Sequence, residues 1–187
     1  MGRKPIARPV AGFTLIEALV VVLLVVVTAT VVVPGMRNLA DTNRLRTEVR
    51  RLHAAIYLVR SEAILRNMPV LMCPSPMAST GERVCSGIFS EGWIIFPDRD
   101  RDRHPDESEE LIRVSGALPE GFTLTNRKGT RHAAEFITYL PDGTSHRNRT
   151  LMLCSANPKM SSWSVVMNIV GRPRVARDWG DCSDRQL

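Results

Sequence analysis

The chain has 187 residues and a formal net charge of +6. A leader and an apolar run at the N-terminus leave roughly 150 residues, which is enough for one globular domain and excludes a second. Arg3, Lys4 and Arg8 supply part of the positive charge from the leader alone, so the basic composition is weak evidence for an anionic partner.

The first predicted element is an apolar helix over residues 13–33, which follows a basic leader at residues 1–12. At ~1.5 Å per residue such a helix spans about 30 Å, the thickness of the hydrocarbon core of a bilayer, so we expect a membrane-embedded helix. Basic residues before the helix stay in the cytoplasm, which directs the C-terminal domain to the periplasm. A secretory signal cleaved after the run is the alternative, but the length of the run and Glu17 near its start argue against it.

Glu17 is the only charged residue between Phe13 and Val33. A carboxylate near the start of a membrane segment costs on the order of 3 kcal/mol unless it finds a partner. If the leader is cut after Gly12, Phe13 becomes the N-terminus, and its ammonium group can pair with Glu17 of a neighbouring subunit. The alternative is that Glu17 lies at the membrane edge and snorkels into the headgroups.

The sequence GFTLIEA at residues 12–18, followed by the apolar run, resembles the class III signal of type IV pilins and type II secretion pseudopilins. The resemblance implies that a prepilin peptidase cleaves between Gly12 and Phe13 and methylates Phe13. It gives Glu17 a role in setting register during filament assembly. Pro34 falls where pilins commonly carry a helix-kinking proline.

Residues 34–68 are predicted to form the amphipathic second half of the same long helix, after a break at Pro34 and Gly35. Apolar residues recur on one face at steps of four and three, namely Leu45, Val49, Leu52, Ile56, Val59 and Ala63. The opposite face is charged, so we expect the apolar stripe to pack against the domain. Asn67 and Pro69 end the helix.

Residues 69–187 are predicted to form a β-rich domain, because short apolar runs alternate with turn residues. The candidate strands are 70–73, 93–96, 111–114, 122–125, 135–140, 151–154 and 164–170. The sequence PDG at residues 141–143 is a strong turn signal. Short connections without helical spacers imply antiparallel pairing, so the fold class is α+β, with one long N-terminal helix packed on an antiparallel β-sheet.

A series of short motifs in this domain resembles the GspH/FimT family of pseudopilins and minor pilins. In chain order they are RSEAI at 60–64 with Asn67, Cys73 and Cys85, Gly92 and Trp93 leading to Phe96 and Asp98, PDG at 141–143, Leu153 and Cys154, and Gly171 and Arg172. The resemblance implies a pilin-like subunit of a type IV pilus or a type II secretion pseudopilus, anchored in the inner membrane and partnered by other pilins or pseudopilins. A monomeric anchored periplasmic protein is the competing interpretation.

Four cysteines lie in the domain, at positions 73, 85, 154 and 182. An even number in an oxidising compartment is compatible with two disulfides, for which three pairings are possible. We favour Cys73 with Cys85 and Cys154 with Cys182, because each pair closes a local loop. A zinc site is the rival interpretation, but there is no C-x-x-C and the histidines show no ligand spacing relative to the cysteines.

An arginine-rich segment near the C-terminus suggests a nucleic-acid partner. Arginines contact phosphate oxygens and an exposed tryptophan such as Trp179 can stack on a base, so this segment could hold DNA without reading its sequence. FimT-type minor pilins are associated with DNA uptake through a G-R-x-R motif, and the matching positions are Gly171, Arg172 and Arg174, with Arg177 nearby. Two further groups, Arg127, Lys128 and Arg131 and separately Arg147 and Arg149, would extend the patch if their loops converge. The alternative is a solvated, arginine-bearing turn held by Cys182.

An acidic loop at residues 98–109 matches most ligand positions of the calcium loop D-x-[DN]-x-[DN]-G-x₅-E. The sixth position should be glycine and is Arg103, and Arg99 and Arg101 add opposing positive charge. We therefore predict a solvated loop between strands, with no metal and no cofactor. Catalytic residues are not predicted either, because the chain contains no G-x-S-x-G, G-x-G-x-x-G or Walker motif.

Overall fold

The structure, a computed structural model, describes residues 12–157 and 160–182. The predicted leader, apart from Gly12, lies outside these residues. The chain divides into two compact units, Met1–Asp41 and Thr42–Leu187. Helix α1, Leu15–Arg66, contributes residues to both units.

Helix α1 begins at a capping residue and ends at a left-handed one. The hydroxyl Oγ1 of Thr14 accepts a hydrogen bond of 3.3 Å from the backbone N–H of Glu17, which satisfies one of the free donors of the first turn. At the other end Asn67 has a φ of 52°, the conformation in which helices commonly stop. The helix assignment continues through Pro34, so the predicted break is not seen there, and a kink at Pro34 stays a prediction.

Among the described residues, no helix has the length and apolar content that a membrane span requires. The membrane-embedded helix over residues 13–33 stays a prediction.

The apolar stripe predicted for the second half of α1 is confirmed. All six of its residues are buried, each with at most 1% of its surface exposed: Leu45, Val49, Leu52, Ile56, Val59 and Ala63. This face forms one continuous core with side chains from both sheets of the domain. Burial of an aliphatic side chain contributes about 1.5–3 kcal/mol relative to exposure, so the stripe is a main source of stability for the domain.

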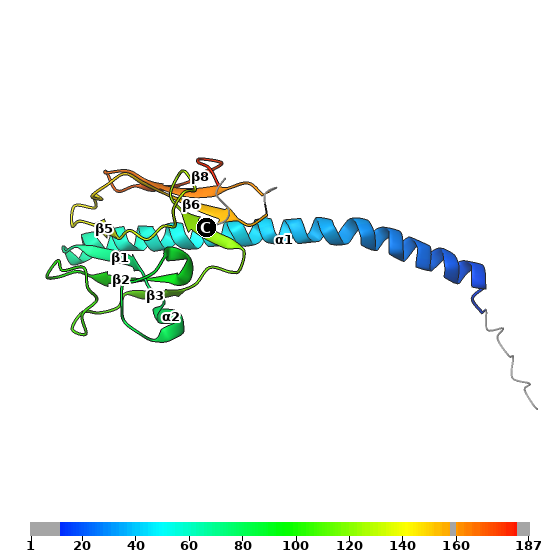
Figure 1. The fold of residues 1–187 in the computed structure, drawn as a ribbon, viewed down its shortest axis with the longest axis horizontal. Coiled ribbons are helices and arrows are strands. Elements are labelled where there is room, and N and C mark those ends of the chain that lie inside the picture. The colour runs from blue at the N-terminus through cyan, green and yellow to red at the C-terminus, as the bar shows by residue number, and fades with distance from the viewer. Residues whose placement is uncertain (1–11, 158–159, 183–187) are drawn as a thin grey trace, which may run out of the picture. The chain divides into compact units, whose positions relative to one another are not determined.

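The strands in the described residues form two four-stranded antiparallel sheets instead of the one sheet expected. The strands are β1 (Val70–Pro74), β2 (Gly92–Pro97), β3 (Arg113–Gly116), β4 (Phe122–Thr125), β5 (Ile137–Tyr139), β6 (Arg149–Ser155), β7 (Trp163–Met167) and β8 (Pro173–Arg177). The first sheet has the order β3-β2-β1-β5 and the second β4-β6-β7-β8. In Figure 1 the second half of α1 runs between the two sheets.

The first sheet is covered on both faces. Alternate residues of β1 point to opposite sides: Met72 joins the core against α1, whereas Leu71 and Cys73 join a second cluster with Ile94 and Phe96 of β2. The short helix α2 (Met77–Thr80) follows β1, and the 3-10 turn η1 (Phe89–Glu91) precedes β2. Because both faces of the sheet are buried, β1 and β2 are apolar throughout and lack the alternation of a strand that has one solvated face.

Both disulfides of the favoured pairing are present in the described residues. Cys73 bonds to Cys85 with a Cα–Cα distance of 5.5 Å, and Cys154 bonds to Cys182 with a distance of 5.7 Å. The first closes the loop that leaves β1, and the second ties the C-terminal segment to β6. Each bond restricts the unfolded chain, which stabilises a domain by about 3 kcal/mol.

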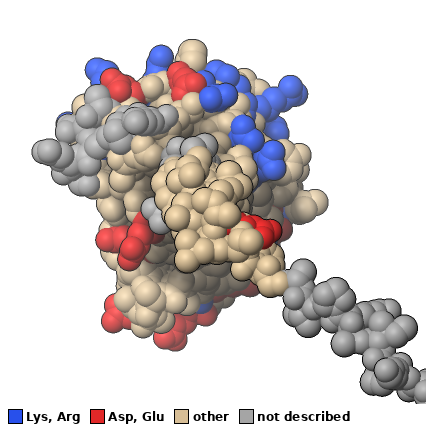
Figure 2. Space-filling model, turned by 90° about the vertical axis from the view of Figure 1, so that its right-hand side faces the viewer, with Lys and Arg blue, Asp and Glu red and all other residues tan. Residues whose placement is uncertain are grey.

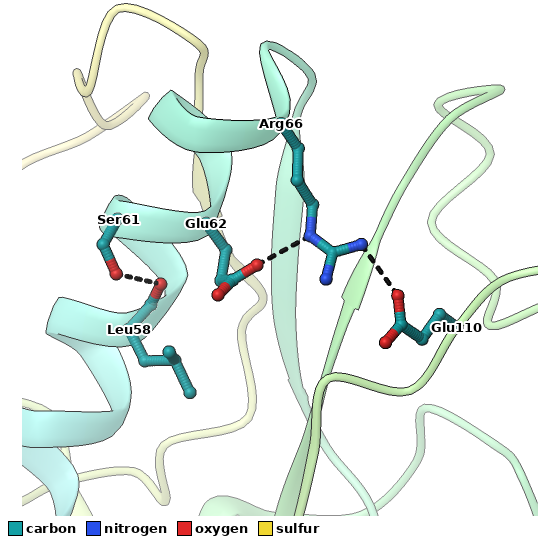
Figure 3. A network of polar contacts seen from close by, with 5 residues as sticks. All are labelled: Leu58, Ser61, Glu62, Arg66 and Glu110. Carbon is teal, nitrogen blue, oxygen red and sulfur yellow. Dashed lines mark hydrogen bonds and ion pairs between the residues drawn. The ribbon is translucent and has the colours of Figure 1, made fainter.

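A polar network ties the end of α1 to the loop before β3. The guanidinium of Arg66 donates to Glu62 one turn earlier, at 2.6 Å, and to Glu110 at 2.8 Å. Figure 3 shows Arg66 between the two carboxylates, together with the Ser61 hydroxyl, which donates to the carbonyl of Leu58. The two carboxylates raise the pKa of Arg66, the hydrogen bond to Glu62 being the largest cause.

Candidate functional site

The N-terminal segment presents its apolar side chains to the outside. Within one chain Phe13 is 80% exposed and Leu15 84%, and the large apolar residues of the following turns are also exposed. A contiguous apolar surface of this kind marks a site that lipid or another protein covers.

Glu17 lies in the first turn of α1, where the unpaired N–H groups of the helix favour a negative charge. Its side chain is exposed. None of the ion pairs formed by the described residues includes Glu17. Within the described part of one chain, the carboxylate therefore remains available to a cation from elsewhere.

A second candidate site is a groove on the outside of the second sheet, with a volume of about 760 Å³. The turn after β4, the loop before β6 and strands β7 and β8 all contribute to its walls. Its arginine and tryptophan lining residues are Arg127, Arg131, Arg147, Arg149, Arg174 and Trp179. The two arginine groups that the sequence left separate thus converge with the C-terminal segment in one groove.

Four of these guanidinium groups carry uncompensated charge. Arg127, Arg131, Arg147 and Arg174 are exposed, and none of them takes part in an ion pair among the described residues. Figure 2 shows Lys and Arg side chains gathered at one side of the face in view, with most of the acidic side chains elsewhere. An anionic ligand is the chemistry that such a groove favours.

Arg149 differs from the other arginines of the groove because its guanidinium is used internally. It donates to the backbone carbonyls of Glu135 and Phe136, at 2.6 and 2.7 Å, and pairs with the Glu135 carboxylate at 2.8 Å. Burial lowers the pKa of Arg149, which the charge of Glu135 partly opposes. This arginine therefore builds the wall of the groove.

Trp179 lies at the groove with two arginines over its ring. The guanidinium carbon of Arg127 is 4.6 Å from the ring centre, and that of Arg174 is 5.4 Å away. The backbone N–H of Asp181 donates to the carbonyl of Arg127 at 3.0 Å, and the disulfide to Cys182 follows at once. The C-terminal segment is therefore held in place against the turn after β4.

The structure separates the residues of the predicted G-R-x-R motif. Arg174 lines the groove, whereas Gly171, Arg172 and the nearby Arg177 do not. Arg172 is exposed and its backbone N–H donates to Asn168. Arg177 pairs with Asp178 and donates to the hydroxyl of Ser161 at 2.7 Å.

Gly171 has a structural role in the turn before β8. Its φ is 81°, and a Cβ at this position would overlap the carbonyl oxygen of Gly143. Only glycine fits this close approach of two backbones.

The loop at residues 98–109 is less solvated than predicted. Asp98 is 3% exposed and Glu109 is 9% exposed. The expectation of a solvated loop is therefore wrong for these two carboxylates, and their burial raises the pKa of both.

Comparison with known proteins gives a match to a family model described as "Type II transport protein GspH", over residues 48–171. The chain belongs to this family. The matched region begins in the second half of α1 and ends at the turn before β8, so it includes both sheets except for the last strand. No curated protein sequence matches the chain.

Two solved structures share the fold of this GspH-family chain. The type IV minor pilin FimU of Pseudomonas aeruginosa matches with a TM-score of 0.52 and 16% identity, over 74% of this chain and 92% of that chain. The minor pseudopilin EpsH of the type II secretion system of Vibrio cholerae matches with a TM-score of 0.51 and 13% identity, over 71% of this chain and 96% of that chain. The predicted pilin-like fold, a long N-terminal helix with antiparallel sheet, is thus confirmed.

One element that forms the candidate groove was missed by sequence reasoning. Strand β8, which carries Arg174, pairs with β7 in the register Val166 to Arg174. Its sequence PRVAR starts with proline and contains only two apolar residues, so it lacks the signal of a half-buried strand. Val175, which lies opposite Val165 of β7, is its one large apolar residue and is too little to indicate a strand.

Proposed function

We propose that the chain is a minor subunit of a type IV pilus or of a type II secretion pseudopilus. It starts as a single-pass protein of the inner membrane, with its C-terminal domain in the periplasm, and later enters the filament through its N-terminal helix. The observation that carries this proposal is the GspH-family match over residues 48–171. The exposed apolar start of α1, which needs a covering partner, supports it.

Processing by a prepilin peptidase fits the local geometry. Gly12 and Phe13 precede the first residue of α1, Leu15, and both are exposed. A peptide bond in such a segment is accessible to an enzyme without unwinding the helix. Cleavage and methylation there would leave the Phe13 ammonium group at the positive end of the helix dipole, where a cation is unfavourable. The carboxylate of Glu17 from a neighbouring subunit would offset that charge.

The test is assembly of the full chain carrying Glu17→Gln, compared with Glu120→Gln. Both changes remove one exposed carboxylate, but Glu120 lies in the β-rich domain. We expect both variants to be cleaved, so that the mass of each mature chain corresponds to a sequence that begins at methylated Phe13. Only Glu17→Gln should lose incorporation into sheared filaments, by about tenfold, which corresponds to one charge-assisted hydrogen bond of about 1.4 kcal/mol. Normal incorporation of Glu17→Gln would contradict the proposed pairing.

The two machines are distinguished by the phenotype of a deletion. Loss of surface pili with normal protein secretion indicates a minor pilin, and loss of secretion with normal pili indicates a pseudopilin. Re-expression of the unaltered chain is the control in both cases.

Nucleic-acid binding is a second candidate function, and the convergence of arginines around Trp179 favours it. Four exposed guanidinium groups without ion-pair partners among the described residues line the same groove as one half-exposed aromatic ring, and two of them, Arg127 and Arg174, lie over that ring. Phosphates bind such a positive groove independently of sequence, and an aromatic ring offers a stacking surface for bases. A DNA strand taken up by a filament is the ligand that this proposal predicts.

Electrophoretic mobility shift of the full chain, purified in a mild detergent, tests this candidate. We expect Arg127→Ala with Arg174→Ala to weaken DNA binding and to reduce the slope of affinity against salt by about two, because each arginine neutralises one phosphate. Arg113→Ala, which removes an exposed arginine of the first sheet, should have no effect. Absence of binding by the unaltered chain at low salt would exclude DNA as the ligand.

A further inference from the structure

The acidic loop after β2 has the spacing of a calcium loop, and its first three carboxylates lie close together. Oxygen atoms of Asp98, Asp100 and Asp102 lie within 4.8 Å of one another. They occupy positions 1, 3 and 5 of a twelve-residue loop in which Asp106 is position 9 and Glu109 is position 12, the positions that supply ligands in an EF-hand.

The residue that made the sequence match imperfect adopts the required backbone conformation. Arg103, at position 6, has a φ of 66°, although an EF-hand places glycine there for its sharp turn. Its backbone N–H donates to Oδ1 of Asp98 at 3.2 Å, which folds the loop back over its first carboxylate. The missing glycine therefore does not prevent the turn.

Glu109 supplies an observation, independent of the acidic spacing, that points to a cation. Its side chain is nine-tenths buried, and Oε1 accepts the backbone N–H of Arg99, at position 2 of the loop, at 2.9 Å. The second oxygen, Oε2, is buried without a hydrogen-bond partner among the described residues. Burial, and the nearby charges of Asp98 and Asp100, raise the pKa of Glu109. A buried carboxylate oxygen without a partner, close enough to Asp98 and Asp100 for their charges to raise its pKa, is costly unless a cation compensates the charge.

The arginines of the loop do not neutralise these carboxylates. Arg99, Arg101 and Arg103 are exposed, and Arg103 lines a separate cavity beside β5. Among the described residues, no ion pair includes Asp98, Asp100 or Glu109. The carboxylates of the loop are therefore left without a counter-charge from these arginines.

We propose that this loop binds one Ca²⁺ ion. Four ligands are carboxylates, at positions 1, 3, 5 and 12, namely Asp98, Asp100, Asp102 and Glu109. The backbone carbonyl of His104, at position 7, is the fifth, and Asp106, at position 9, binds through a water molecule. The donor set consists of oxygen atoms only, which suits a hard cation, and seven oxygens in a flexible loop suit Ca²⁺ better than the smaller Mg²⁺. Zinc prefers nitrogen and sulfur ligands, so it is the poorer fit.

The loop that would hold the ion is bonded both to the segment beside the Cys73–Cys85 disulfide and to the end of α1. Arg83, two residues before Cys85, donates to the backbone carbonyls of Pro105 and Glu109. The next residue, Glu110, pairs with Arg66 at the end of α1 (Figure 3). Calcium therefore stiffens the connection from β2 to β3 between the disulfide loop and the helix.

Isothermal titration calorimetry of the full chain in detergent, freed of metal with a chelator, tests the site with CaCl₂ alone. We expect one site with a Kd at or below about 1 mM, the range of extracellular calcium modules, and weaker binding of MgCl₂. Glu109→Gln and Asp100→Asn should each weaken Ca²⁺ binding at least about tenfold, because each removes a charged ligand. Calcium should also raise the thermal midpoint of unfolding relative to EGTA, and both variants should lose that increase.

Glu107→Gln is the matched control, because it removes an exposed carboxylate of the same loop at a position that supplies no ligand. Its affinity for Ca²⁺ should be unchanged. Equal weakening by Glu107→Gln would indicate diffuse charge attraction and would overturn the proposal, as would the absence of heat and of any thermal shift at about 10 mM CaCl₂. Asp100 is exposed, so Asp100→Asn keeps the test valid if Glu109→Gln fails to fold.

Discussion

The guanidinium group of Arg127 lies over the indole ring of Trp179, 4.6 Å from its centre. The two residues are far apart in the sequence and come together because the C-terminal segment docks on the turn after β4. This arrangement places a cation and a half-exposed aromatic face at the same mouth of the groove. An attraction of this kind contributes about 0.5–1 kcal/mol at an exposed site, so it orients Arg127 without immobilising it completely.

Replacement of Trp179 should therefore weaken the binding of single-stranded DNA. Stacking of one base on an aromatic side chain contributes about 1–3 kcal/mol, so Trp179→Ala should raise the Kd by about tenfold or more. Trp179→Phe keeps an aromatic face and should recover part of the affinity. Fluorescence anisotropy of a labelled oligonucleotide measures both values, and equal affinity of the alanine variant and the unaltered chain would contradict a stacking role.

Gly171→Ala should destabilise the domain through its backbone. The φ of Gly171 is 81°, and its added Cβ would overlap the carbonyl oxygen of Gly143. Gly81→Ala is the matched control, because Gly81 has a similar φ of 76° but nothing within 4 Å of its Cβ position. We expect a loss of about 1 kcal/mol for Gly81→Ala from the left-handed backbone alone, and about 2–3 kcal/mol for Gly171→Ala. Urea unfolding measures the difference in the free energy of unfolding. Equal losses in the two variants would show that the overlap with Gly143 adds no destabilisation.

Features set by neighbours in the sequence could be predicted. The stripe of α1 from Leu45 to Ala63 follows directly from helical periodicity, and strands such as β2 are short apolar runs between turns. The division into two sheets could not be predicted in the same way. It depends on the pairing of β1 with β5, in which Met72 lies opposite Ile137, and no local pattern selects that distant partner.

The candidate sites differ in the same respect. The segment from Gly12 to Glu17 is contiguous, so its sequence alone carries the signal. The basic groove brings Arg127, Arg147 and Arg174 together from three separate parts of the chain, and their convergence depends on the path of the chain. The acidic loop is a different case. The calcium-loop pattern requires glycine at its sixth position, but Arg103 adopts the left-handed backbone conformation there, so the sequence pattern alone counts against a turn that the chain in fact makes.

Tyr139 should make the domain less stable at high pH. Its side chain is fully buried, its hydroxyl has no hydrogen-bond partner among the described residues, and burial raises its pKa from 10.0 to about 12. Between these values the unfolded chain releases the phenolic proton while the folded chain retains it, so the free energy of unfolding falls as the pH rises from 10 towards 12. Below pH 10 both states are protonated and the effect is absent.

Tyr139→Phe isolates this effect. It should remove that part of the alkaline destabilisation and should leave stability at pH 7 equal or up to about 1 kcal/mol higher, because it removes an unpaired buried hydroxyl. Tyr57→Phe, at a residue that is 56% exposed, should change neither value. Guanidinium unfolding at a series of pH values measures both variants. Identical alkaline profiles for Tyr139→Phe and the unaltered chain would rule out Tyr139 as the source.

The two disulfides should contribute similarly to stability and differently to the basic groove. Removal of either pair by alanine substitution relaxes the unfolded chain and should lower the free energy of unfolding by about 3 kcal/mol. Only the pair Cys154–Cys182 holds the segment that carries Trp179, whereas Cys73–Cys85 closes a loop of the first sheet. The double variant at positions 154 and 182 should therefore also lose affinity for DNA, measured by anisotropy at a temperature where both variants are folded. If both double variants bind DNA equally, the docked C-terminal segment is not part of the binding surface.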